Sequence, residues 1–213
     1  MTDPERRKKR SEKLLKKQGI PINPSLPAIE AEEEATLRSA KDMAIRAVGL
    51  CAVALRGEGL KQQEVISLLN GKDVWASVTP EEKKFLLQKN PARQDMVNFK
   101  WRYESLWVLL WALGHMEDLG APTSICDVQS AVRIVLDIPS EDFIQRAKSR
   151  SISEILDEAD LIYRYDWAVV DTRIKGDDPP GNLDPGVVYE RHYALNWLIG
   201  YMDQEWDDVT TDT

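Results

Sequence analysis

The segment from residue 94 to 113 constrains the fold most, because large aromatic side chains crowd into it. Trp101, Tyr103, Trp107 and Trp111 fall within about three helical turns and alternate with leucines and a valine. Apolar residues on nearly every side of a helix indicate that it is buried on most sides. The segment therefore predicts one helix that contributes to a tryptophan-rich core.

Helix-start patterns recur along the rest of the chain. A Ser or Thr followed three residues later by an acid, which caps a first turn, occurs at Ser39, Thr79 and Ser151. The segment after Asp127 predicts a helix, although its β-branched run VRIVLDI leaves a short strand as the alternative. The remaining predicted helices cover residues 4–18, 61–70, a short stretch from 140, and about 187–201. Strand patterns are otherwise scarce, so we predict an all-α, single-domain bundle of about eight or nine helices.

Charge divides the chain into three predicted parts. Residues 1–27 form a basic helix, with eight Lys or Arg between positions 6 and 17, followed by a proline-rich connector. Residues 28–205 form the helical core, and residues 206–213 form an acidic tail. We expect this tail to dock on the core through Trp206 and Val209, which would place Asp207 or Asp208 against an arginine.

The composition excludes several classes of protein. The net charge of −8 opposes nucleic-acid binding by the body of the protein. The basic helix could still bind nucleic acid, and salt would weaken that contact. We favour the interpretation that the basic side chains of this helix are a solvated face. Cys51 and Cys126 belong to no CxxC or Cys/His pattern, so structural zinc is not expected. No stretch approaches 18 apolar residues, so we expect no membrane span and a cytoplasmic location.

Familiar catalytic motifs are absent from the sequence. It contains no HExxH, phosphate-binding loop, GxGxxG, GxSxG or EF-hand pattern, and only two histidines, His115 and His192. His115 follows Gly114 at the end of a predicted helix, where we expect its side chain to satisfy last-turn carbonyls. The sequence thus assigns no metal and no cofactor.

Polar residues set into apolar helices form the candidate site. Arg150 with Glu154, Asp160 with Arg164, and His192 with Asn196 have the i,i+4 spacing that places two side chains on one helix face. A buried network of paired charges explains such residues, and a carboxylate and histidine pocket, with or without a divalent cation, is the alternative. The candidate residues are Arg102, Glu104, Arg150, Glu154, Asp160, Arg164, Glu190, Arg191, His192, Asn196, Asp207 and Asp208.

Several phrases of the sequence resemble a bacterial family catalogued as domain of unknown function 4272. They are LRSAKDMAIRAVGL, WRYESLWVLLWALG, RSISEILDEADLIYRYDWAVVD, GVVYERHYALNWLIG and WDDVTTDT. The resemblance spans nearly the whole chain and implies a helical protein. It implies no activity, and it transfers no catalytic residue to this sequence.

These observations favour a non-catalytic intracellular protein that binds a small molecule or another protein. The alternative is a hydrolase-type enzyme that uses the Glu, Asp and His residues of the candidate site, with a divalent cation as an option. Convergence of the carboxylates on one open cleft would favour the enzyme, whereas full pairing of the carboxylates with arginines would favour the non-catalytic protein.

Overall fold

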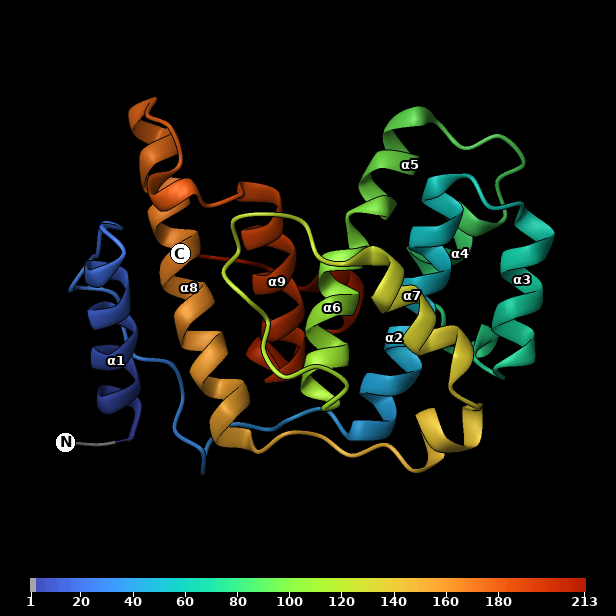
Figure 1. Ribbon diagram of the computed structural model, residues 1–213, viewed down its shortest axis with the longest axis horizontal. Coiled ribbons are helices and arrows are strands. Elements are labelled where there is room, and N and C mark those ends of the chain that lie inside the picture. Colours follow the sequence, from blue (N-terminus) through green and yellow to red (C-terminus); the bar gives the residue numbers. More distant parts are fainter. Residues whose placement is uncertain (1–2) are drawn as a thin grey trace.

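The computed structural model describes residues 3–213, and that part of the chain contains nine α-helices and no strand (Figure 1). The all-α prediction is confirmed. The helices are α1 (Asp3–Lys17), α2 (Ala40–Glu58), α3 (Gln62–Gly71), α4 (Pro80–Leu86), α5 (Arg93–Lys100), α6 (Arg102–Ala112), α7 (Val128–Asp137), α8 (Ile152–Lys175) and α9 (Pro185–Leu198). Three short turns lie between helices: η1 (Trp75–Ser77), the π-helical η2 (Glu141–Gln145) and η3 (Pro180–Asn182). Two more follow α9: η4 (Tyr201–Asp203) and η5 (Trp206–Asp208).

The helices pack in a row along the long axis of the molecule. Helix α1 lies at one end against α8, α8 packs on α9, α9 on α6, and α6 on α2 (Figure 1). Helix α2 then contacts α3, α4, α5 and α7, which complete the other end. Buried apolar side chains from every helix except α5 form one continuous cluster, in which Leu50 of α2 and Leu106 of α6 are fully buried. The partly buried Met96 and Phe99 of α5 pack against this cluster. The predicted burial of this segment on most sides holds for α6, in which nine of eleven residues are buried, but not for α5, which buries none.

Each helix start predicted from a capping pattern is confirmed. The hydroxyl oxygens of Ser39, Thr79 and Ser151 accept hydrogen bonds from the backbone N–H three residues ahead, at the starts of α2, α4 and α8. These bonds satisfy N–H groups that have no partner within the helix. The strand alternative after Asp127 is wrong, because residues 128–137 form α7 and bury Ala131 and Val135 on one face.

The prediction of one helix over residues 94–113 is wrong, because the helix breaks at Trp101 into α5 and α6. A Cβ on Gly57 of α2 would lie 2.7 Å from the Met96 carbonyl oxygen, so the α2 and α5 backbones touch at this point. A Cβ on Gly186 would lie 2.6 Å from the Trp101 ring, which therefore packs on the first turn of α9. The break lets α5 pack on α2 while Trp101 packs on α9.

The acidic tail lies on the core through Trp206, which is 3 % exposed. Its ring makes edge contacts with Tyr193 and Trp197, at centroid distances of 5.1 and 5.4 Å. The predicted contact of Asp207 or Asp208 with an arginine is not observed, because neither residue forms an ion pair within residues 3–213. The Asp207 carboxylate instead accepts a hydrogen bond from the Glu81 backbone N–H at 3.2 Å. The start of α4 offers unpaired N–H groups, which compete with an arginine for the carboxylate.

The basic helix α1 uses part of its charge to bind the body. The Arg7 side chain is 1 % exposed and contacts the carboxylates of Asp3 and Asp157, at 2.7 and 3.1 Å. Lys8 donates hydrogen bonds to carbonyl oxygens of the proline-rich connector. Arg7, Ser11 and Leu15 form the buried face of α1, so this helix is a packed element of the fold.

Candidate functional site

Two ion pairs join α6 and α9 at the centre of the molecule. The Arg102 guanidinium lies 3.1 Å from the Glu190 carboxylate, and Arg191 Nε lies 3.3 Å from the Glu104 carboxylate. Glu190 also accepts a hydrogen bond from the Ser105 hydroxyl at 2.7 Å. Both carboxylates are buried, and buried charges of this kind require partners. These candidate residues link two helices.

Two further candidate pairs lie within and just before α8, at the predicted i,i+4 spacing. Arg164 donates to both carboxylate oxygens of Asp160, at 2.9 and 2.6 Å, and both side chains are buried. Arg150 donates to Glu154 at 3.0 Å and also to the Trp111 carbonyl oxygen, so this pair ties the start of α8 to the end of α6.

His192 and Asn196 lie on a different side of α9. The His192 Nδ1 atom lies 3.1 Å from the Asp166 carboxylate, and Asn196 Nδ2 donates to the Thr210 carbonyl oxygen at 2.8 Å. Both side chains line a cavity of about 130 Å³ that none of the candidate carboxylates Glu104, Glu154 and Glu190 reaches.

The candidate carboxylates therefore do not converge. Each of the five buried acidic residues in the described chain has a cationic or histidine partner: Glu82 with Arg46, Glu104 with Arg191, Asp160 with Arg164, Asp166 with His192, and Glu190 with Arg102. Residues 3–213 contain no group of three His, Cys, Asp or Glu side chains arranged to hold a metal ion. The geometry favours a paired network over a metal-dependent hydrolytic site.

The two cysteine thiols are not activated, and His115 packs on an aromatic ring. Burial raises the pKa of the Cys51 thiol to about 12, and burial also raises that of Cys126, so both thiols stay protonated at neutral pH. The predicted capping role of the His115 side chain is not observed: its ring stacks on Phe143 at 5.3 Å, and burial lowers its pKa. The backbone N–H of His115 donates to the Leu110 carbonyl oxygen, so the main chain itself closes this helix end.

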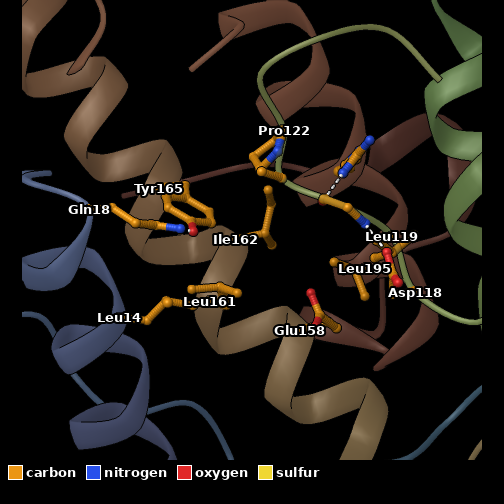
Figure 2. A pocket seen from close by; sticks show the side chains of 13 residues that line it. Leu14, Gln18, Asp118, Leu119, Pro122, Glu158, Leu161, Ile162, Tyr165 and Leu195 are labelled. Atoms are coloured by element: carbon orange, nitrogen blue, oxygen red, sulfur yellow. Dashed lines mark hydrogen bonds between the residues drawn. The ribbon is translucent and has the colours of Figure 1, made fainter. Parts of the chain in front are cut away.

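A cavity of about 230 Å³ lies between α1, α8, α9 and the loop at residues 118–122 (Figure 2). Its wall is mainly apolar, and a few polar groups reach it from separate elements. This combination is typical of small-molecule sites. The apolar lining residues are Leu14, Leu119, Ala121, Pro122, Leu161, Ile162 and Leu195.

Glu158 supplies a carboxylate to this cavity and has no ion pair or hydrogen bond with any of residues 3–213. Burial raises the pKa of this carboxyl group, Arg191 opposes the shift, and the carboxylates of Asp157 and Asp118 add to it. The group therefore takes up a proton more readily than an exposed glutamate. Figure 2 shows Glu158 on α8 pointing into the space between α8 and the loop at residues 118–122.

Three other polar residues border the same cavity. Arg191 donates from Nε to Glu104 and from Nη1 to the Gly120 carbonyl oxygen, and its Nη2 has no partner within residues 3–213. At the α1 side, the Tyr165 hydroxyl donates to the Gln18 side-chain oxygen at 2.7 Å (Figure 2). The cavity thus offers an uncommitted carboxyl group, an uncommitted N–H group of an arginine, and a hydrogen-bonded Tyr and Gln pair.

Glu158 is not among the site residues predicted from the sequence, although a pattern marks it. It shares the apolar stripe of α8 with Ile155, Ile162 and Tyr165, and the positions three and four residues away on either side carry no base. An acid on an apolar stripe without a basic partner on its own helix must find one elsewhere or remain unpaired. Gln18 and Asp118 carried no comparable pattern, because their place at the cavity depends on α1 and the 118–122 loop folding against α8.

No match to this chain was found among curated proteins or among solved structures. The family described as "Domain of unknown function (DUF4272)" matches residues 7–209, which include every helix from α2 to α9 and most of α1. The chain belongs to this family.

Proposed function

We propose that this protein is a non-catalytic binding protein for a small molecule, which occupies the cavity between α1, α8 and α9. The observation that carries the proposal is Glu158, whose carboxylate faces this cavity unpaired while the five buried acids of the described chain are all paired. An unpaired acid next to apolar surface lowers stability, and such a group is retained more readily where a ligand provides its partner.

The lining indicates an amphiphilic ligand. Leu14, Leu161 and Leu195 present apolar surface for an aliphatic or aromatic body. Glu158 and Arg191 lie on the α8 and α9 sides and provide an acceptor and a donor for a polar head group. A binding role fits this set better than catalysis, because no Ser, Thr, Cys, Lys or His lies with these groups among the lining residues.

A thermal-unfolding screen against small amphiphilic metabolites tests the proposal. A ligand at a hundred times its dissociation constant stabilises the folded state by about 2.7 kcal/mol, which corresponds to a rise in Tm of roughly 5 to 10 °C for a domain of this size. We expect such a rise from compounds that combine an apolar body with one polar head.

A cavity-filling variant tests whether the ligand that raises Tm binds in this cavity. Leu14→Trp places a large ring at the cavity from the partly exposed surface of α1, and it is expected to abolish the shift. Leu136→Trp is the matched control, because Leu136 has a similar exposure, 42 % against 38 % for Leu14, and lies on α7 away from the cavity. A ligand-induced shift that survives Leu14→Trp unchanged would reject this cavity as the site.

We further infer that the protein acts in the bacterial cytoplasm. Two buried free cysteines, Cys51 and Cys126, suit a reducing compartment. No helix within residues 3–213 has the length and apolar composition needed to cross a bilayer. Fractionation of the source cells, followed by detection of the protein in the cytosolic or another fraction, tests this assignment.

A further inference from the structure

A second cavity lies on the other side of the contact between α8 and α9. Ile162 of α8 and Arg191 of α9 line the first cavity, whereas the next residues along each helix, Tyr163 and His192, line the second. The proline-rich connector and the C-terminal tail close it, through Glu30 and Asp212. One helix pair therefore presents two separate sites.

The floor of this second cavity contains a histidine with a free nitrogen. His192 is 2 % exposed, and its Nδ1 lies 3.1 Å from the carboxylate of Asp166, which is also buried. An ionised carboxylate only accepts hydrogen bonds, so this contact places the proton on Nδ1. In the neutral ring, Nε2 is then an acceptor, and it has no partner within residues 3–213.

Asn196, Glu30 and Asp212 add further acceptors to the cavity, whereas the hydroxyl groups of Tyr163 and Tyr201 can either donate or accept. Asn196 donates through Nδ2 to the Thr210 carbonyl oxygen, which leaves its side-chain oxygen facing no donor in the described chain. Glu30 and Asp212 add two carboxylates at the exposed mouth, and neither forms an ion pair with residues 3–213. No Lys or Arg is among the lining residues.

We infer that this second cavity binds a small primary ammonium ion. Its three N–H groups match the acceptors of His192, Asn196 and the mouth carboxylates, and its charge complements Glu30 and Asp212. An anion would meet two carboxylates and no lining cation, because the nearby Arg164, which contacts Pro27 and Tyr163, is paired with Asp160. The volume of about 130 Å³ admits a head group and a short alkyl chain, whereas a drug-sized molecule needs several hundred Å³. This site is independent of the ligand proposed for the first cavity.

NMR of protein labelled with ¹⁵N at histidine tests the inference, because the chain contains only His115 and His192. Methylammonium chloride is the probe, with tetramethylammonium chloride at equal ionic strength as its matched control. Methylammonium is expected to shift the His192 Nε2 resonance at millimolar concentrations, as befits so small a ligand, and to leave His115 unchanged. Tetramethylammonium carries the same charge without N–H groups, so it is expected to cause no shift.

A pair of tail variants tests the charge contribution. Asp212→Asn removes a mouth carboxylate, and it is expected to weaken methylammonium binding about fivefold, the Coulomb effect of one charge about 4 Å away in water. Asp208→Asn changes an exposed acid of the same tail that does not line this cavity, and it is expected to leave binding unchanged. Both sites are exposed, so both variants are expected to fold.

Three results would each overturn the inference. They are a His192 Nε2 resonance that does not respond to methylammonium, an equal response to tetramethylammonium, and equal weakening by the two tail variants. The first two would show that the acceptors bind no N–H donor, and the third that net charge alone attracts the ion.

Discussion

Arg191 belongs both to the α6–α9 contact and to the cavity beside α1, and these two regions treat their acids in opposite ways. In the contact, the Glu104 carboxylate lies 3.3 Å from Arg191 Nε and also accepts the Cys126 backbone N–H. In the cavity, Glu158 faces the same arginine without forming an ion pair. The paired acids hold helices together, so the unpaired acid is the better indicator of binding.

The largest expected effect comes from breaking a fully buried pair. Asp160→Asn leaves the Arg164 guanidinium buried without a counter-charge, because both side chains are at most 2 % exposed. We expect a loss of about 3–5 kcal/mol in the free energy of unfolding, measured by urea titration.

Asp171→Asn is its control on the same helix. Asp171 pairs with Lys175 at the same i,i+4 spacing, and the Lys175 side chain is 60 % exposed. The loss is expected to stay below about 0.5 kcal/mol. Equal losses for the two variants would contradict the view that burial, and not pairing alone, makes the network structural.

The docked tail is expected to give the next largest effect. Trp206→Ala removes a ring that lies between Tyr193, Trp197 and the Arg46 guanidinium, whose centre is 5.2 Å from the ring centroid. We expect a loss of about 3 kcal/mol, the low end for a buried tryptophan, because the tail can detach and relieve the cavity. A Tm measured by calorimetry checks it. Met202→Ala is the control, and it is expected to change Tm little because the Met202 side chain is 68 % exposed. An unchanged Tm for Trp206→Ala would show that the tail does not stabilise the core.

Local patterns in the sequence predicted the fold well. The capping box of Ser151 and Glu154 needs only four consecutive residues, and it marks the start of α8 correctly. The break at Trp101 could not be predicted in this way, because it depends on Gly57 and Gly186, which approach from α2 and α9. Tertiary contacts override helical propensity at such a position.

The candidate site likewise contains pairs that the local sequence predicts and contacts that it does not. The pairs Arg150–Glu154 and Asp160–Arg164 follow from i,i+4 spacing within the sequence. The pair of Arg102 with Glu190 joins residues 88 positions apart, so spacing carries no information on it. The cavities are harder still to predict from the sequence, because each forms where three or more separate segments meet.

The smallest expected effect distinguishes the unpaired acid from the paired network by its pH dependence. A raised pKa in the folded state means that folding favours the protonated carboxyl group of Glu158. Its contribution to stability is therefore fully present below the ordinary value of 4.5 and is lost as pH rises through the folded-state pKa. Glu158→Gln removes this loss, so the variant is expected to be about 1 kcal/mol more stable than the parent at pH 8 and similar to it at pH 4, by urea unfolding.

Glu33→Gln is the control, because Glu33 is exposed and its side chain has no hydrogen bond or ion pair with residues 3–213. Its stability is expected to show no such dependence on pH. If Glu158→Gln instead destabilises the protein at pH 8, the carboxylate has a stabilising partner in the folded chain, and the cavity no longer differs from the α6–α9 contact.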